Sequence, residues 1–175
     1  MKKTLALALA LAVGPWTGTA EAQPGPVSIE TGIGFTSDPS TFLLAAELPI
    51  QVAPDVEVGP LLQLGVGDDR LIVAPTVNAR YSFLLSRYVK NNRPVWDRLR
   101  PIAHAGLGFA YLEHDRPVND DDDLGFLFNL GAGIQYEWTD RLAFGTRMTF
   151  NVMPTKVLDD RFFFSWQLAQ LRYRF

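Results

Sequence analysis

The chain has no cysteine, so disulfide bonds cannot stabilise its fold. Histidine is scarce as well, with two residues in 175, which leaves few candidates for acid–base chemistry or for binding a transition metal. No basic excess is present, because 16 Lys and Arg stand against 19 Asp and Glu, for a net charge of −3. A chain without a basic stripe is a poor candidate for binding nucleic acid. We therefore expect no disulfide framework, no nucleic-acid partner and no cofactor.

The chain also lacks an internal apolar run as long as the ~20 residues that a membrane-spanning helix needs. Its one apolar run, residues 5–13, follows the positive pair Lys2 and Lys3 and precedes an A-x-A pattern at residues 20–22. This order of features is typical of a secretory signal peptide. We expect residues 1–22 to be a signal peptide and residues 23–175 to form one domain. If that domain lies in a membrane, it must be a closed barrel, because no helix can span.

What the sequence does contain is alternation of apolar and polar side chains, and the last strand shows it most clearly. Two sets alternate there one by one: Leu171, Tyr173 and Phe175 against Gln170, Arg172 and Arg174. An extended strand sends successive side chains to opposite faces. A last strand that is apolar on one face, cationic on the other and terminated by Phe is typical of an outer-membrane β-barrel.

Alternation recurs in eight segments of the chain. They are residues 27–35, 41–52, 56–67, 71–83, 101–112, 124–138, 141–153 and 162–175. Each is about as long as the ~9–11 residues of a tilted transmembrane strand, or longer. Eight is an even number, as in single-chain bacterial barrels. The sequence therefore predicts an all-β fold, an eight-stranded antiparallel up-and-down transmembrane barrel.

The connections between these segments fall into two groups. Residues 53–55, 84–100 and 139–140 would lie at the end that holds both termini, the periplasmic end. Residues 36–40, 68–70, 113–123 and 154–161 would form the outer loops, which hold most of the acidic residues.

Two features do not fit plain strands. Pro60 and Pro75 lie inside predicted strands, where a missing N–H interrupts the ladder, so we expect bulges there or shifted strand starts. Phe162, Phe164 and Trp166 fall on the polar, lumen face of the last strand. We expect these rings to lie above the membrane, or a bulge to reverse the register.

Three consecutive stretches in the second half resemble a known family. They read PIAHAGLGFAY over residues 101–111, FLFNLGAGIQY over residues 126–136 and TDRLAFG over residues 139–145. In this order they are similar to the small outer-membrane β-barrel family of OmpA, OmpX and OmpW type. The resemblance implies a monomeric barrel in the bacterial outer membrane. Its partners would be outer-membrane lipid, lipopolysaccharide and, through the C-terminal strand, the barrel-assembly machinery. Where the family's C-terminal signal has Gly, this chain has Gln170.

The inward face of the predicted barrel carries charges of both signs. The candidate lumen network is Glu30, Glu47, Glu57, Arg80, His104, Glu137, Arg147, Arg172 and Arg174. An eight-stranded barrel is just wide enough for side chains to fill. A buried, unpaired charge costs several kcal/mol, so these groups should pair and plug the lumen. The alternative is a narrow or gated path for small, even hydrophobic, solutes.

Aromatic residues gather at the expected periplasmic ends of the strands. They are Tyr81, Phe83, Tyr136, Trp138, Tyr173 and Phe175. A belt of aromatic residues at this position is typical of the aromatic girdle at a membrane interface. In the alternative, a soluble lipocalin-like barrel, Trp138 beside a turn would be exposed to water.

Catalysis and metal binding have weaker support. His114 lies between Glu113 and Asp115, but no serine is near it in sequence, so a lipid A-modifying hydrolase is disfavoured. The run Asp120, Asp121, Asp122 and Asp123 is a weak candidate for Ca²⁺ or Mg²⁺, since its spacing fits no EF-hand loop. We expect a non-enzymatic protein with a structural or surface-interaction role.

Overall fold

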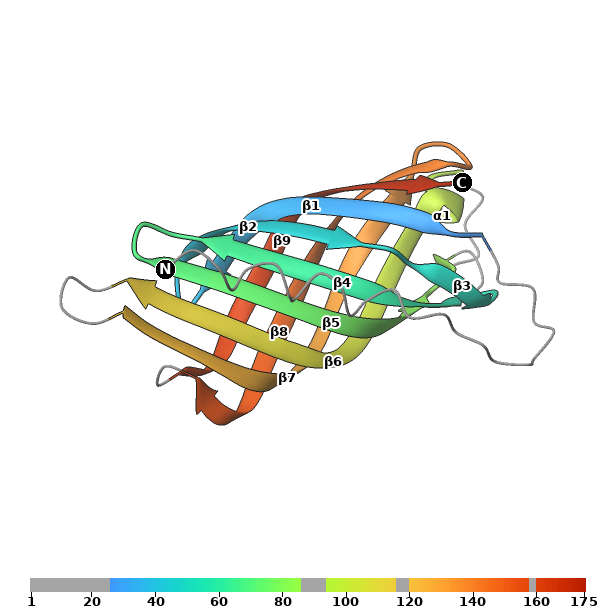
Figure 1. Ribbon diagram of the computed structural model, residues 1–175. Helices are drawn as coiled ribbons and strands as arrows, with labels where there is room; N and C mark the ends of the chain where they lie inside the picture. Colours follow the sequence, from blue (N-terminus) through green and yellow to red (C-terminus); the bar gives the residue numbers. More distant parts are fainter. Residues whose placement is uncertain (1–25, 86–93, 116–119, 158–159) are drawn as a thin grey trace.

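The computed structural model describes residues 26–85, 94–115, 120–157 and 160–175, which form a β-barrel (Figure 1). Its elements are β1 (Ser28–Ser37), β2 (Thr41–Glu47), β3 (Ile50–Ala53), β4 (Val56–Val66), β5 (Arg70–Ser82), α1 (Pro94–Arg98), β6 (Leu99–Asp115), β7 (Asp120–Glu137), β8 (Leu142–Val157) and β9 (Asp160–Arg174). No helix among the described residues is long and apolar enough to cross a membrane. The expected signal peptide lies outside the described residues.

The sheet closes on itself. Sequential strands pair antiparallel, and β1 pairs with both β2 and β9. Both β2 and β3 pair with β4, so they are two parts of one interrupted strand and the wall has eight strands. Closure leaves the wall without a free edge strand. The predicted eight-stranded antiparallel barrel is confirmed.

The two ends of the barrel differ. The terminal end, where β1 begins and β9 ends, carries α1 and the turns before β4 and β8. The opposite loop end has short connections between long strands. There β6 continues to Asp115 and β7 begins at Asp120. The predicted loop over residues 113–123 is therefore wrong, because paired strands, from Leu112 opposite Asp123 onward, occupy most of it.

Both prolines lie in strands of unshifted register, so the expected bulges and shifted starts are wrong. Pro60 pairs with Val77 and Pro75 with Leu62 on the same continuous ladder. The carbonyl of Pro60 accepts a hydrogen bond from the N–H of Leu48 at 3.0 Å, at the gap between β2 and β3. The side of Pro60 that lacks an N–H therefore faces this gap, where strand pairing is already interrupted. On its β6 side, Pro75 lies between the bridged residues Val73 and Thr76, and the register across it is unchanged.

A β-bulge in β9 explains the misplaced aromatic residues. Ile33 of β1 pairs with Ala169, but the next residue, Gly34, pairs with Gln167. Leu168 is the extra residue, and it faces outward together with Ala169. The bulge therefore reverses the side-chain alternation, as one of the two predicted explanations required.

As a result, Phe162, Phe164 and Trp166 lie on the outer face, and assigning them to the lumen is wrong. Their rings contact other rings there: Trp166 contacts Phe35 at 5.6 Å, and Phe150 contacts Phe164 at 5.2 Å and Phe162 at 6.0 Å between centroids. The residues that alternate with them, Phe163, Ser165 and then Gln167, are buried inside the barrel.

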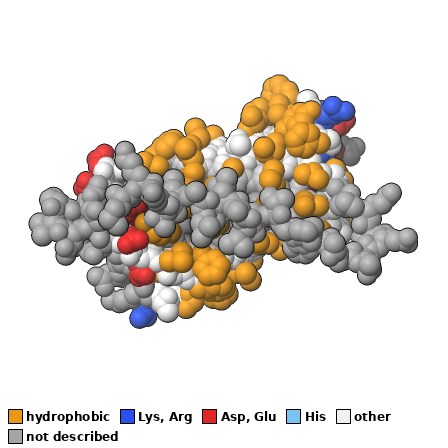
Figure 2. All heavy atoms as spheres, viewed as in Figure 1, with side chains coloured by type: hydrophobic (Ala, Val, Ile, Leu, Met, Phe, Trp, Pro, Cys, Tyr) orange, Lys and Arg blue, Asp and Glu red, His pale blue; other side chains and the backbone are white. Residues whose placement is uncertain are grey.

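The molecule is inside-out compared with a water-soluble barrel. Large apolar side chains such as Leu130, Leu107 and Phe42 are more than half exposed on the outer wall, whereas most buried polar and charged side chains face the lumen. Figure 2 shows apolar side chains over much of the visible wall and most visible acidic side chains toward the loop end. A wall of this kind is stable only against lipid, because the exposed apolar area would be costly in water.

Candidate functional site: the lumen

The terminal half of the lumen holds a network of buried charges centred on Arg80 of β5. Its Nη1 donates to Glu30 Oε2 at 2.7 Å, and its Nε donates to Glu57 Oε2 at 3.1 Å. The Arg80 and Glu30 side chains are each 1% exposed. Because Glu57 is also the cross-strand neighbour of Arg80, and Glu30 comes from β1, the contacts tie three strands together across the lumen.

A second arginine, Arg147 of β8, reaches the same carboxylates from another side. Its Nη1 donates to Glu47 Oε2 at 2.5 Å, and its Nη2 lies 3.3 Å from Glu30 Oε1. The same Nη2 donates to Gln167 Oε1 at 3.2 Å. Arg147 therefore joins β8 to β1, β2 and β9.

The third arginine, Arg172 of β9, pairs with Glu57 and donates to Ser28 Oγ at 3.0 Å. Gln135 accepts a hydrogen bond from Arg172 at 3.4 Å and donates one to Glu30 Oε2 at 2.8 Å. Gln135 therefore links Arg172 to the carboxylate that pairs with Arg80. The network thus balances three carboxylates with three guanidinium groups. A balance of opposite charges helps a buried ion-pair cluster to offset the cost of desolvation.

Two of the predicted lumen residues lie at the terminal rim. Glu137 pairs with Arg100 at 2.7 Å and is 3.9 Å from Arg174, and these side chains are 24% to 37% exposed. Arg100 was expected in a periplasmic connection, but it belongs to β6. The rim pairs are in contact with solvent and contribute little stability compared with the buried network.

The middle of the lumen holds neutral polar groups. Ser165 donates to Gln63 Oε1 at 2.7 Å, and Asn151 donates to Ser165 Oγ at 3.2 Å, so β4, β8 and β9 are linked across the lumen. His104 Nε2 lies 3.1 Å from Thr149 Oγ1, and which of the two donates depends on the tautomer. The predicted inward position of His104 is observed, and its side chain is held by one hydroxyl.

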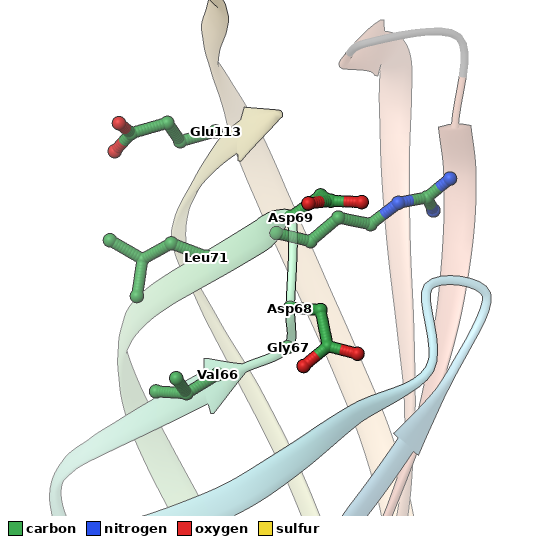
Figure 3. A pocket seen from close by; sticks show the side chains of 7 residues that line it. Val66, Gly67, Asp68, Asp69, Leu71 and Glu113 are labelled. Atoms are coloured by element: carbon green, nitrogen blue, oxygen red, sulfur yellow. The ribbon is translucent and has the colours of Figure 1, made fainter. Parts of the chain in front are cut away.

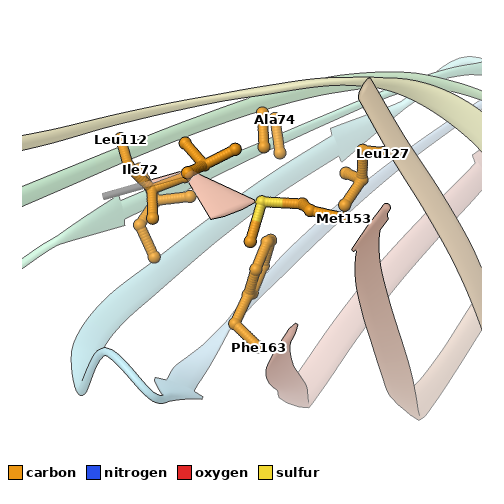
Figure 4. Packing of buried hydrophobic residues seen from close by; sticks show 8 residues of the cluster. Ile72, Ala74, Leu112, Leu127, Met153 and Phe163 are labelled. Carbon is orange, nitrogen blue, oxygen red and sulfur yellow. The ribbon is translucent and has the colours of Figure 1, made fainter. Parts of the chain in front are cut away.

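The loop half of the lumen is apolar, which the sequence analysis did not anticipate. The cluster consists of Ile72, Ala74, Ala110, Leu112, Leu127, Met153, Val157 and Phe163, all at most 3% exposed. In Figure 4 Met153 and Phe163 project between side chains from β5 and β7. A signal for this cluster was present, since residues 71–74 are apolar on both faces of the strand. Polar side chains are also buried at the loop end, where the hydroxyl groups of Thr36 and Thr41 are 2.7 Å apart.

At the loop-end rim, a shallow cavity of about 190 Å³ lies beside the turn between β4 and β5. It is lined by Val66, Gly67, Asp68, Asp69, Arg70, Leu71 and Glu113. Figure 3 shows Val66, Leu71 and Glu113 projecting to one side of the turn and Asp68 and Asp69 to the other. The polar groups therefore do not converge on one point.

The candidate metal run begins β7 rather than forming a loop. Asp122 accepts a hydrogen bond from the Tyr111 hydroxyl at 3.3 Å, and Asp123 accepts from the N–H of Leu124 at 2.8 Å. The side chains of Asp120 and Asp121 lie outside the described part of the structure. Within the part described, no group of three or more His, Asp or Glu side chains is arranged to hold a metal ion.

The predicted girdle residues lie on the outer wall toward the terminal end. Edge-to-face contacts join Tyr81 with Phe83 at 4.7 Å and Tyr173 with Phe175 at 5.3 Å. Trp138 is 60% exposed and contacts the ring of Phe144 at 6.3 Å. Tyr136, near the end of β7, is half-buried. Amphipathic rings in this arrangement suit the boundary between lipid and water.

Comparisons with solved structures agree with this architecture, whereas comparisons of the sequence found no relative. No protein-family model matches the sequence, and no curated protein matches it. Among solved structures, the N-terminal β-barrel domain of Pseudomonas aeruginosa OprF matches with a TM-score of 0.67 and 17% identity, over 87% of this chain and 100% of that one. Neisserial surface protein A matches with a TM-score of 0.64 and 14% identity, over 86% and 96% of the two chains.

A third similar structure is Ail, the attachment invasion locus protein of Yersinia pestis. It matches with a TM-score of 0.53 and 16% identity, over 86% of this chain and 99% of that one. At these identities the likeness concerns the fold and not the activity. The chain has the fold of the small bacterial outer-membrane β-barrels, with transmembrane strands and a buried salt-bridge network in its lumen.

Proposed function

We propose that this chain is a sealed barrel of the bacterial outer membrane, with a structural role and a surface-presenting role, and that it is neither a channel nor an enzyme. The observation that carries the proposal is that buried side chains occupy the lumen at three levels along its length. Charged pairs occupy its terminal half, neutral polar groups its middle and apolar side chains its loop half.

Two seals of different chemistry argue against conduction. An ion that entered from the terminal end would have to separate arginine–glutamate pairs that are almost wholly buried. An ion that entered from the loop end would have to pass Phe163 and Met153, which are 0% and 1% exposed. A charge in such an apolar layer is strongly disfavoured. The two barriers lie in series, so opening one of them would not give a path.

The same filling argues against catalysis. Among the described residues, His104 is the histidine that contacts a hydroxyl group, that of Thr149. His104 is 2% exposed and Thr149 is 0% exposed. A substrate cannot reach a nucleophile inside a filled lumen. His114, the other histidine, lies at the loop end and is half-buried.

The surface role is proposed from the charge of the loop end. Asp68, Asp69, Asp122 and Asp123 are exposed there. Carboxylates at this end would meet lipopolysaccharide phosphates through bridging divalent cations, which prefer oxygen ligands. The barrel would be a monomer inserted by the barrel-assembly machinery, whose recognition signal is the C-terminal strand.

Planar-bilayer recording of the refolded protein tests the proposal. Unboiled and boiled gel samples first establish that the inserted protein is folded, since a folded barrel migrates differently before boiling. The expected result is folded protein with no unitary conductance steps at 100 mV or below, on the order of membrane potentials in cells. Reproducible steps from folded protein would overturn the proposal and favour the narrow-channel alternative.

A further inference from the structure

At the loop end, β7 extends further than its pairing with β8. On one side β7 pairs with β6 as far as Asp115, which stands opposite Asp120. On the other side its pairing with β8 begins at Phe128, opposite Val152. Among the described residues, positions 120–127 of β7 are therefore paired on one side only, and this segment is the open edge. The wall below it is closed, and Figure 1 shows the β6–β7 and β8–β9 hairpins apart from each other at the loop end.

The strand β8 leaves β7 at a proline. In the register of the wall, Pro154 would stand opposite Phe126, and proline has no N–H for the ladder. Instead, β8 is irregular before Val157, and it buries Met153 and Val157, each 1% exposed, in the loop half of the lumen. A Cβ at Gly125 would lie 2.2 Å from Val157 Cγ2, so Val157 packs on the inner side of β7. The end of β8 therefore fills the lumen and does not continue the ladder along β7.

The backbone groups of the open edge follow from the register. The N–H of Trp138 donates to the carbonyl of Leu142 at 2.9 Å, and the ladders of β7 contain no register shift. Alternate residues of a strand direct their N–H and C=O to opposite neighbours, so the even-numbered residues of β7 direct theirs away from β6. On the open edge these residues are Asp122, Leu124 and Phe126. The N–H of Leu124 donates to Oδ1 of Asp123 at 2.8 Å, in the direction from which a further strand would supply a carbonyl.

The side chains of the open edge select a basic partner. Leu124 is 63% exposed, and the exposed Asp122 stands opposite Glu113 of β6. The sequence has Asp at all four positions from 120 to 123. A second copy of this chain would bring the same carboxylates to the edge, and like charges directly opposite each other destabilise a sheet. A strand with cationic side chains is complementary in charge.

We propose that the open edge of β7 binds an extended, basic segment of a partner protein, which joins the sheet as an additional strand. Main-chain hydrogen bonds give such strand addition its affinity, and alternate side chains give its specificity. The segment would place Lys or Arg beside Asp122 and an apolar side chain beside Leu124. This inference rests on the surface role proposed above and names its partner. Conductance steps would overturn the sealed lumen and leave the open edge untouched, so the two failures are distinguishable.

The probe is a short dye-labelled peptide that alternates Lys and Val, and fluorescence anisotropy measures its binding to the refolded protein in zwitterionic micelles. Leu124→Pro removes the edge N–H and adds a ring that blocks an approaching strand, without breaking a bond to β6. The matched control, Leu124→Ala, loses the same side chain but keeps the N–H. The peptide should bind the wild type, and it should bind Leu124→Pro about tenfold more weakly than Leu124→Ala, as for the loss of about one hydrogen bond.

Several outcomes would overturn the proposal. They are a wild type that does not bind the peptide, equal affinities of Leu124→Pro and Leu124→Ala, and equal binding of a peptide that alternates Glu and Val. A wild-type dimer that Leu124→Pro dissociates would assign the edge to a second copy instead. If Leu124→Pro does not fold, a Lys and Val peptide methylated on every backbone nitrogen tests the wild type. It should bind about tenfold more weakly than the unmethylated peptide, and equal binding would contradict strand addition.

Discussion

Glu30 and Glu47 stand directly opposite each other on β1 and β2, two buried carboxylates on neighbouring strands. Arg147 lies 2.5 Å from Glu47 and 3.3 Å from Glu30, while Arg80 lies 2.7 Å from Glu30 and 3.9 Å from Glu47. Each arginine thus contacts both carboxylates. Like charges directly opposite on adjacent strands destabilise a sheet, so β1 and β2 depend on cations supplied by β5 and β8.

Arg147→Met should lower the free energy of unfolding by about 3–5 kcal/mol, because it leaves Glu47 and Glu30 buried with half of their cations. Urea unfolding in lipid vesicles, followed by the gel shift between folded and unfolded barrels, measures the change. Arg141→Met, at an exposed position in the turn before β8, is the control and should leave the midpoint unchanged. Equal midpoints for Arg147→Met and the wild type would show that the network does not stabilise the barrel.

Removing a cation together with its carboxylate should be far less damaging than removing the cation alone. The double variant Arg147→Met with Glu47→Leu keeps the remaining charges balanced, with Arg80 and Arg172 against Glu30 and Glu57. Buried pairs replaced by apolar residues of similar size are often neutral in stability. The double variant should therefore unfold at higher urea than Arg147→Met. If the two losses simply add, the pairing argument is wrong.

The apolar layer should contribute on its own account. Phe163→Ala empties part of the cluster and should cost about 3–5 kcal/mol, as for other large-to-small changes in a packed core. Its neighbour Phe162, 41% exposed on the outer wall, gives the control variant Phe162→Ala, which lipid can compensate. Urea midpoints compare the two. If Phe163→Ala lost less stability than Phe162→Ala, the assignment of Phe163 to a packed core inside the barrel would be wrong.

The faces of most strands could be predicted because a period of two identifies opposite sides without any knowledge of neighbours. Partners could not be predicted in this way. Arg80 and Glu30 are separated by 50 residues, and their contact depends on the closure of the whole barrel. The buried charges of the terminal half were therefore expected as a group, while the links of Arg147 to both carboxylates were not.

Local interruptions limited the prediction elsewhere. The bulge at Leu168 reverses the alternation in β9, and no pattern within that strand shows where the extra residue lies. The apolar half of the lumen was missed for a different reason. Where both faces of a strand are apolar, as near Ile72, alternation carries no information about which side is the lumen.

Trp138 should lie at the interface between lipid and water. Its 60% exposure and its place at the terminal end suit an amphipathic ring that reaches the headgroups, whereas Trp166 lies within the apolar wall. Fluorescence quenching by lipids labelled at different depths measures this, using the difference between the wild type and Trp138→Phe. The Trp138 signal should be quenched most by shallow labels. If deep labels quenched the Trp138 signal most, Trp138 would lie inside the lipid layer and not in the girdle.

The hydroxyl group of Thr146 makes two hydrogen bonds beside the bulge in β9, and we expect it to stabilise the bulge. Thr146 Oγ1 donates to the carbonyl of Gln167 at 2.8 Å and accepts from Trp166 Nε1 at 2.9 Å, beside the extra residue of the bulge. Thr146→Val keeps the shape of the side chain but leaves an N–H and a carbonyl without this partner in an apolar wall. The expected loss is about 1–3 kcal/mol, measured as a shift of the urea midpoint.

A second variant separates the two bonds of that hydroxyl. Trp166→Phe removes the indole donor but keeps an aromatic ring against Phe35, so the bond to Gln167 remains. If the hydroxyl stabilises the bulge through the carbonyl, Thr146→Val should lose more stability than Trp166→Phe. A larger loss in Trp166→Phe would mean that the ring, not the hydroxyl, maintains the register shift that sends Phe164 to lipid and Phe163 to the lumen.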